Sequence, residues 1–303
     1  MSLLAGRVTV TVPATSANLG PGFDTLGLAL GLYDTLHAEV IGSGLEIEVS
    51  GSGAESVPRD ESHLVVRAMR AAFDALGEDP SGLRLTCENV IPHARGLGSS
   101  SAAIVGGLAL ARALTVDGRE RLPDDELFEL AAEIEGHPDN VAPAVYGGFT
   151  ICGHDAGLAR AGFYSVSSPV DARVSAVVFV PPTGVETKVA RGLLPAQVSH
   201  ADAAANSGRA ALMVAALGFA PEQLYRASRD YLHQDYRRPA MPESLALVDA
   251  LRTDGIAAIV SGAGPTVLAF AIDDADALVS RTPEGWASHH LQVDTEGVRA
   301  YVG

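Results

Sequence analysis

The chain has little cysteine. Its two cysteines, Cys87 and Cys152, lie far apart, belong to no CxxC pair and have no histidine at the spacing of metal ligands. A disulfide scaffold or a zinc site is therefore not expected. Isolated cysteines of this kind are most often buried and reduced, and we expect both to be so here.

Positive charge is also scarce. The 21 Lys and Arg residues are outnumbered by 37 Asp and Glu residues, which gives a formal net charge of −16. A general nucleic-acid binder needs a basic face that neutralises phosphates, so this class of protein is disfavoured. A small anionic ligand is still compatible with the charge, because backbone amides hold a phosphate without any net positive charge.

Long apolar runs are missing as well. No run reaches the ~18 residues, free of charges and turns, that a membrane-spanning helix needs. Residues 1–6 lack the charged-then-apolar layout of a signal peptide, so we expect a cytosolic protein. With 303 residues, 47% of them apolar, the chain is long enough for a large core and suggests two domains.

Strand and helix patterns are mixed in both halves of the chain without a regular βα alternation. This favours the α+β class, with domains over residues 1–168 and 169–303. A strand over 7–13 is expected to end at Pro13, and a loop follows over 14–24. The other elements that matter below are strands over 26–32, 35–41 and 145–152, and helices over 102–114, 123–135 and 221–232.

A glycine-rich loop, Gly96-Leu-Gly-Ser-Ser-Ser101, lies between an expected strand and a helix of small residues. Two glycines let the backbone approach a ligand, and three hydroxyls converge there with the free amides of a helix N-terminus. The loop therefore predicts an anion site, most simply for a polyphosphate. It is neither a Walker A loop nor a Rossmann fingerprint, because both spacings fail. Taken by itself, it is also compatible with a helix start capped by serine.

Two further loops contain glycine, at residues 18–24 and 261–266. Each alone is compatible with a tight turn. Three such loops in one chain are hard to explain as turns, and they predict a cleft between two halves. His137, Asp139 and Asn140 crowd one turn after a helix and indicate a site, although a lone histidine is more often structural.

Several motifs together resemble those of the GHMP kinases, small-metabolite kinases named for galactokinase, homoserine kinase, mevalonate kinase and phosphomevalonate kinase. Residues 92–100, Pro-His-Ala-Arg-Gly-Leu-Gly-Ser-Ser, resemble their second motif. Residues 261–266, Ser-Gly-Ala-Gly-Pro-Thr, resemble the third. Within the superfamily, residues 13–24, 135–144 and 187–191 are similar to the homoserine kinase family.

This resemblance implies a two-domain α+β fold. Its first domain would be related to a ribosomal-protein fold with a left-handed βαβ unit, an exception to the usual handedness. Its second domain would be ferredoxin-like. The implied reaction is the ATP-dependent phosphorylation of the side-chain hydroxyl of L-homoserine, with Mg²⁺, on the route to threonine. The resemblance also implies a tendency to form homodimers.

The resemblance further implies residue roles. Mg²⁺ would be held by Ser100 and Glu135, with Ser101 standing where the family usually has alanine. The nucleotide phosphates would lie on Pro92, His93, Ala94, Arg95, Gly96, Leu97, Gly98, Ser99, Ser100, Ser101 and Ala102. Homoserine would contact Asn18, Asp24, His137, Asp139, Thr187, Arg191, Arg237 and Gly262.

The chemistry of these side chains suits an amino acid. Asp24 fits an ammonium group, whereas Arg191 and Arg237 each present a planar fork to a carboxylate. The choice of Arg237 over the adjacent Arg238 rests on the preceding Tyr236.

Base-using relatives such as mevalonate kinase carry an aspartate where this chain has Asn140, and an amide accepts no proton at neutral pH. We therefore expect Asn140, Glu135 and Ser100 to act by alignment and electrostatics, without a strong general base. Two alternatives stay open: a GHMP kinase acting on another hydroxyl, such as that of mevalonate, and a nucleotide-binding paralogue without turnover.

Overall fold

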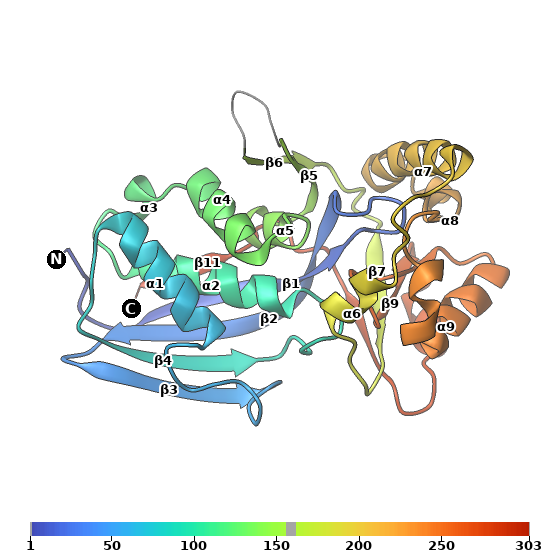
Figure 1. Ribbon diagram of the computed structural model, residues 1–303. Helices are drawn as coiled ribbons and strands as arrows, with labels where there is room; N and C mark the ends of the chain where they lie inside the picture. The colour runs from blue at the N-terminus through green and yellow to red at the C-terminus, as the bar shows by residue number, and fades with distance from the viewer. Residues whose placement is uncertain (1, 156–161, 303) are drawn as a thin grey trace.

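Two β-sheets organise the chain. Over the residues that the computed structural model describes, 2–155 and 162–302, seven strands form the first sheet and four form the second. The sheets lie side by side, and helices pack on both (Figure 1). Strands and helices are mixed in both halves, which confirms the expected α+β class.

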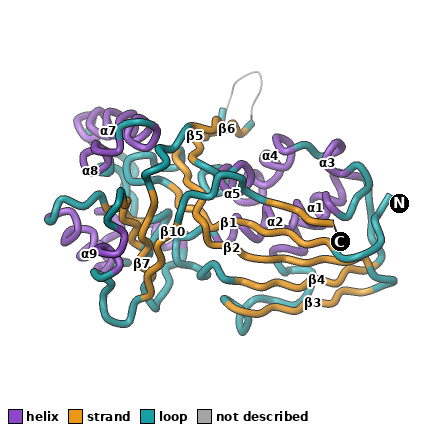
Figure 2. Tube along the Cα trace, turned by 180° about the vertical axis from the view of Figure 1, so that it is seen from behind, coloured by secondary structure: helices purple, strands orange, loops and turns teal. Residues whose placement is uncertain are grey.

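The first sheet has the strand order β11-β1-β2-β4-β3, and β5 and β6 extend it beyond β2. β3 and β4 are parallel neighbours connected through α1, which forms the expected βαβ unit. Helices α1, α2 and α4 cover one face, and Figure 2 shows the strands in front of them from the opposite side. The elements of this part are β1 (Val8–Ala17), β2 (Leu26–Val40), β3 (Gly44–Gly51), α1 (Leu64–Leu76), β4 (Gly82–Asn89), α2 (Ser99–Ala113), α3 (Gly118–Arg121), α4 (Asp124–Glu135), α5 (Val141–Tyr146), β5 (Phe149–His154), β6 (Phe163–Ser168) and β11 (Arg299–Val302).

The second sheet is antiparallel throughout, with the order β10-β7-β9-β8. Along the chain, its last strand lies beside its first, followed by the third and the second, as in a ferredoxin-like sheet. Leu245 of α9 shares a core with Val177, and Met213 of α7 shares one with Val178, so helices cover both faces. The elements are β7 (Ser175–Val180), α6 (Thr187–Gly192), α7 (His200–Gly218), η1 (Pro221–Gln223), α8 (Leu224–Ala227), η2 (Asp235–Ala240), α9 (Pro242–Thr253), β8 (Ala258–Val260), β9 (Val267–Ala271), α10 (Ala275–Val279) and β10 (Ala287–Leu291).

Helix α4 shows how local sequence sets the ends of an element close to the cleft. Pro123 precedes its first turn, and three acidic residues in that turn suit the positive end of the helix dipole. Gly136 ends the helix in the left-handed conformation, with φ 87°. The chain can therefore turn sharply after Glu135, the last residue of α4.

The expectation that the first strand ends at Pro13 was wrong. β1 continues to Ala17, with a register shift between Pro13 and Ala14 in its pairing with β2. Proline removes one ladder donor, but β11 pairs with β1 only from Val8 to Thr11. The residues after Pro13 therefore belong to the sheet rather than to a loop.

Three further expectations were wrong in detail. The strands expected over 26–32 and 35–41 are one continuous strand, β2. Part of the strand expected over 145–152 belongs to α5, which is too short to show a helical period. The helix expected over 221–232 ends at Ala227, because the Asp230 carboxylate accepts the N–H groups of residues 232–234 in a turn of its own.

Two other expectations concern the whole chain. Both cysteines are free and buried, as expected, and burial raises the pKa of the Cys87 thiol to about 12. Judged by length and hydropathy, none of the helices in the described part of the chain qualifies as a bilayer-spanning segment.

Candidate active site

The three glycine loops meet where the two sheets adjoin. Gly262 N–H donates to the Ala17 carbonyl at 3.1 Å, and the Ser261 hydroxyl donates to the Gly96 carbonyl at 2.6 Å. Gly96 has φ +78°, and a Cβ there would collide with the Ser261 carbonyl oxygen. The glycine is therefore required by close backbone approach, and the predicted meeting of the two halves is confirmed.

A cavity of about 260 Å³ opens at this junction. It brings together residues from the end of β1, the start of α2, the turn after α4, helix α6 and η2. The predicted site residues that line it are Asn18, Ala94, Gly96, Gly98, Ser99, Ser100, Glu135, His137, Asp139, Asn140, Thr187, Arg191, Arg237 and Gly262. Six predicted residues of the second motif do not line it: Pro92, His93, Arg95, Leu97, Ser101 and Ala102. Asp24 does not line it either and is connected to it through Arg191.

Helix α2 begins at this cavity without a side-chain cap. Its cap residue is Gly98, with φ 71°, so the alternative of a serine-capped start was wrong. The hydroxyls of Ser100 and Ser101 instead donate to Oε1 of Glu135, at 2.6 and 2.9 Å. The first-turn amides of a 15-residue helix therefore face a cavity that an anion can enter.

Glu135 and the two serines form a group of hard oxygen atoms. Mg²⁺ prefers such oxygens and is usually bound by one or two carboxylates together with substrate phosphates. No group of three or more acidic, histidine or cysteine side chains suited to a metal occurs in the described residues. A single carboxylate with adjacent hydroxyls fits a Mg²⁺ ion that is shared with phosphates. Both serine hydroxyls contact Glu135, so either Ser100 or Ser101 could be the second protein ligand.

Asn140 is oriented by a residue that the sequence did not single out. The Thr15 hydroxyl donates to Asn140 Oδ1 at 2.8 Å, and Thr15 is fully buried near the end of β1. No other hydrogen bond to the Asn140 side chain occurs within the described residues, so its amide N–H donors are left for a ligand in the cavity. Only the continuation of β1 past Pro13, which the sequence pattern concealed, places Thr15 there.

Charged side chains gather at the far side of the cavity from α2. Arg191 binds Asp24 through two hydrogen bonds, of 2.7 and 3.0 Å. Arg237 is only 1% exposed and donates to the Gly262 carbonyl at 3.0 Å. Arg238 is exposed, does not line the cavity and binds Asp235 and Asp249.

The first loop holds Asp24 in place. Asn18 Nδ2 donates to the Gly262 carbonyl at 2.8 Å, and Asn18 Oδ1 accepts the Asp24 N–H at 2.9 Å. Asn18, Leu19 and Asp24 all have positive φ, between 44° and 67°. Such conformations are costly outside glycine and persist only where the surroundings impose them.

Burial and neighbouring charges set the electrostatics. Burial lowers the pKa of His137, but Asp139, whose carboxylate is 3.2 Å away, and Glu135 outweigh it, so the pKa of His137 is raised overall. Burial, reinforced by Arg191, lowers the pKa of Arg237 to about 10. Arg237 therefore stays charged at neutral pH.

An adjoining pocket of about 300 Å³ shares Ala94, Ser99 and Ser100 with the cavity. Its walls are mostly apolar, and His63 contributes a buried Nδ1 without a hydrogen-bond partner. The other lining residues are Asp34, Leu36, Val57, Pro58, Ser62, Leu64, Val65, Cys87, Asn89, His93 and Ala103. They come from four separate segments, so no sequence motif marks this pocket.

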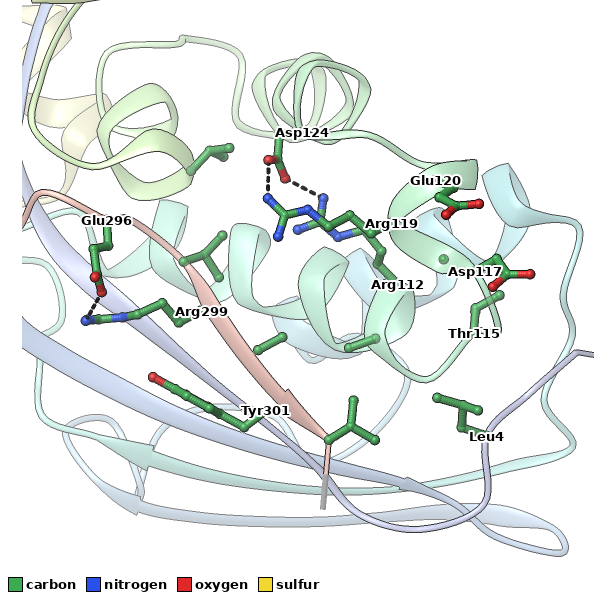
Figure 3. Close-up of a pocket in the computed structure, with 16 residues that line it drawn as sticks. Leu4, Arg112, Thr115, Asp117, Arg119, Glu120, Asp124, Glu296, Arg299 and Tyr301 are labelled. Atoms are coloured by element: carbon green, nitrogen blue, oxygen red, sulfur yellow. Dashed lines mark hydrogen bonds and ion pairs between the residues drawn. The ribbon is translucent and has the colours of Figure 1, made fainter.

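A larger cavity, of about 750 Å³, lies beside β11 and contains none of the predicted site residues (Figure 3). Arg112 and Arg119 both pair with Asp124 there, and Arg299 pairs with Glu296. Its guanidinium groups are thus neutralised by carboxylates of the protein. Arg191 of the glycine-loop cavity is paired as well, but the buried Arg237 forms no ion pair within the described residues. The three glycine loops also meet at that cavity, which makes it the better candidate for an active site despite its smaller volume.

Known proteins resemble the chain over most of its length. Residues 63–148 match the GHMP kinases N terminal domain, and residues 213–283 match the GHMP kinases C terminal domain. The chain is 57% identical to the homoserine kinase of Streptomyces avermitilis, over 97% of this chain and 95% of that protein. It is 45% identical to that of Rhodococcus opacus, over 96% of each.

Solved structures show the same likeness. The crystal structure of homoserine kinase from Cytophaga hutchinsonii superimposes with a TM-score of 0.83, covers 99% of both chains and is 25% identical. Mevalonate kinase from L. major has a TM-score of 0.70 over 97% of both chains, at 18% identity, and shares the fold alone.

Proposed function

The chain belongs to the homoserine kinase family of the GHMP kinases, and we propose that it transfers the γ-phosphoryl group of ATP to the side-chain hydroxyl of L-homoserine. The product would be O-phospho-L-homoserine, on the route to threonine. One observation carries the proposal: the uncapped start of α2 borders the same cavity as two arginines suited to the carboxylate of an amino acid, Arg191 and Arg237, and Arg191 holds the carboxylate of Asp24. This arrangement suits transfer of an anionic group to an amino acid.

We assign the nucleotide to the α2 side of the cavity. The first-turn amides of α2 and the glycines before it would hold the phosphates. The adjoining apolar pocket has the size and lining to take a base, and it opens beside Ser99 and Ser100. ATP binding would thus rest on backbone donors and shape, which explains how a chain of net charge −16 can bind a polyanion.

Ser100 and Glu135 are the proposed Mg²⁺ ligands. Their oxygens already lie 2.6 Å apart at the mouth of the phosphate loop. When bound, the ion would neutralise charge on the phosphate oxygens. Glu135 also keeps the serine hydroxyls turned toward that point, since both donate to it.

We assign the amino-acid group of homoserine to the opposite side. Asp24 would receive the ammonium group, and Arg191 and Arg237 would receive the carboxylate. The bidentate pair of Arg191 and Asp24 already presents both charges side by side, complementary to a zwitterion. Mevalonate has a carboxylate but no ammonium group, so Asp24 favours an amino acid. Asn18, His137, Asp139, Thr187 and Gly262 would complete this part of the pocket.

Phosphoryl transfer would be catalysed by aligning the acceptor hydroxyl with the phosphate rather than by a strong general base. Because Thr15 donates to the oxygen of Asn140, the Nδ2 of Asn140 can offer its N–H donors to the reacting groups. Such donors orient the acceptor hydroxyl and stabilise charge on the transferring group. Positioning alone can contribute ~7–11 kcal/mol, which removes the energetic need for a base.

The division into residues 1–168 and 169–303, the homodimer and the cytoplasmic location stay predictions. β6 ends at Ser168 and β7 begins at Ser175, which supports the proposed boundary, while β11 returns to the first sheet.

The test is a coupled assay for ADP with ATP, Mg²⁺ and one acceptor at a time. We expect ADP with L-homoserine and none above background with mevalonate or without an acceptor. ADP formation with mevalonate instead would support the other type of GHMP kinase. Absence of turnover with every acceptor, from protein that still binds ATP, would support a non-catalytic paralogue.

A further inference from the structure

We propose that His233 is a positioning residue, which fixes the guanidinium of Arg237 in the cavity and ties it to the loop of residues 18–24. The inference rests on the proposed function only in naming homoserine as the ligand of Arg237. His233 does not line the cavity. It lies just before η2, the short helix that carries Arg237.

The hydrogen bonds of His233 define one tautomer. Its Nε2 lies 2.7 Å from the Gly20 carbonyl oxygen, which can only accept, so Nε2 carries the proton. Its Nδ1 lies 3.0 Å from Nη1 of Arg237, which can only donate, so Nδ1 presents a lone pair. His233 is therefore a neutral linker that donates to the loop and accepts from the arginine.

The surroundings keep this ring neutral. His233 is completely buried, and burial, reinforced by the charge of Arg237, lowers its pKa. The Asp230 carboxylate lies 3.7 Å from Nε2, but it also accepts the backbone N–H groups of residues 232–234. Asp24 is the other carboxylate whose charge acts on the ring. A proton on Nδ1 would point at a guanidinium donor and break the link.

The link closes a ring of contacts around the substrate end of the cavity. Arg237 Nη1 also donates to the Gly262 carbonyl at 3.0 Å, and the same carbonyl accepts from Asn18 at 2.8 Å. Gly20, two residues after Asn18, is held by His233. The first loop, the third glycine loop and η2 are thus fixed against one another through three polar side chains, those of Asn18, His233 and Arg237.

Phe23 adds an apolar contact to the same unit. Its ring stacks on His233 with centroids 5.3 Å apart and an interplanar angle of 30°. The guanidinium carbons of Arg191 and Arg237 lie 5.5 and 5.7 Å from its centroid. Both arginines therefore lie against one aromatic ring, which itself stacks on His233.

Two matched substitutions separate the functions of the two ring nitrogens. The Asn amide in H233N reaches the place of Nδ1 and can still accept from Arg237, but it loses the Gly20 contact. The Gln amide in H233Q reaches the place of Nε2 and can still donate to Gly20, but it loses the Arg237 contact. Each variant lacks one hydrogen bond and the stacked ring, so their stabilities should be similar.

The experiment measures kcat, the homoserine KM, the ATP KM and the melting temperature for wild type, H233N, H233Q, R237A and H233Q/R237A. We expect H233Q to raise the homoserine KM roughly tenfold, because an arginine loses its acceptor, and to leave the ATP KM unchanged. We expect H233N to raise it no more than about threefold. The double variant should have the homoserine KM of R237A, since His233 acts through Arg237.

Equal rises in KM for H233N and H233Q, or a double variant whose effects add, would overturn the proposal and leave His233 a purely structural residue. A homoserine KM unchanged in R237A would instead overturn the assignment of Arg237 in the proposed function. A readout without any substrate is the ¹⁵N spectrum of His233 in the wild-type protein. We expect a neutral ring protonated on Nε2 at pH 6, and a protonated Nδ1 there would contradict the proposal even in a protein that phosphorylates no homoserine.

Discussion

At the scale of single residues, neighbours decide what each polar group can do. The side-chain amide of Asn140 accepts no proton at neutral pH, and the hydrogen bond from Thr15 fixes which end of that amide faces the ligand. Glu135 accepts hydrogen bonds from two hydroxyls and forms no ion pair within the described residues, so its charge remains available to a metal ion. Variants that keep the shape and change one charge are therefore the most informative.

The variant N140D tests the absence of a base. The Thr15 hydroxyl can still donate to the carboxylate, but the cavity loses N–H donors and gains a negative charge beside the phosphate site. We expect kcat to fall by roughly 100-fold, the effect of losing one donor that stabilises charge in the transition state. The pH profile of turnover should stay flat. A turnover that rises steeply with pH in N140D, while wild type stays flat, would show that a base matters.

The variant E135Q tests the Mg²⁺ assignment. The amide keeps the size of the side chain and an oxygen acceptor for the serines, but it loses the charge that the ion needs. We expect turnover to fall roughly 100-fold with the homoserine KM nearly unchanged, because a bound cation contributes several kcal/mol to phosphoryl transfer. Normal turnover at low Mg²⁺ concentration would exclude Glu135 as a ligand. Measuring S100A and S101A beside it would show which serine shares the ion.

Asp34 gives a prediction for stability. Burial raises its pKa to about 6, although Val90 and Ile91 donate their N–H groups to it. The folded state therefore holds this proton up to a higher pH than the unfolded chain does. Stability contributed at this site is greatest when the carboxyl is protonated, and it is lost as the pH rises through about 6.

The variant D34N removes that titration and keeps the acceptor for both amides. Since a rise of about two pKa units corresponds to roughly 3 kcal/mol, we expect D34N to exceed wild type in free energy of unfolding by up to that amount at pH 8. The difference should fall to about 1 kcal/mol at pH 4.5, where the unfolded chain has already lost most of this proton but the folded protein still holds it. Urea unfolding at the two pH values measures it, and a difference that is independent of pH would show that Asp34 is ionised in the folded protein throughout this range.

At the scale of elements, the start of α2 depends on one glycine. Gly98 has φ +71°, and a Cβ there would collide with the Thr15 hydroxyl and approach Asn140 Oδ1 to 3.2 Å. Gly77, which ends α1, has φ +67° and open space at the Cβ position. The two glycines share the same backbone strain on substitution and differ in what a methyl group would meet.

The variants G98A and G77A should therefore diverge in activity. Each pays the left-handed backbone cost of about 1–2 kcal/mol. We expect G77A to lower the melting temperature and keep kcat, whereas G98A should lose most of its kcat because the pair of Thr15 and Asn140 is displaced. Equal loss of activity in both variants would mean that α2 responds to strain alone.

The sequence was sufficient to predict the elements with strong local signals and the loops that carry the motifs. α4 has its proline, acidic first turn and terminal glycine, and the predicted ligand residues Asn18, Glu135 and Arg191 do reach one cavity. Thr15 was hidden because a proline usually ends a strand, and here the bulge and the short partner strand tolerate it. His233 and the apolar pocket depend on contacts between segments far apart in the chain, which no local pattern encodes.

At the scale of the whole molecule, the phosphate side of the cavity is assigned to the first half, whereas the substrate side takes residues from both halves. The phosphate loop belongs to α2 on the first sheet, whereas Arg191 and Arg237 come from α6 and η2, beside the second. If the substrates divide in the same way, a variant in the second half should weaken homoserine binding and spare ATP binding. The bidentate Arg191 gives the sharpest case, because it also orients Asp24.

We expect R191A to raise the homoserine KM by about 10–100-fold, since a charged hydrogen-bonded partner is lost and Asp24 is left unpaired. Its ATP KM should stay within about twofold, because α2 lies on the other side of the cavity. The matched control is R238A, which also loses two carboxylate contacts but does not line the cavity. R238A should keep both KM values, because exposed ion pairs contribute little. A rise of both KM values in R191A would mean that the halves respond to ligands as one unit, and an unchanged homoserine KM would remove Arg191 from the substrate site.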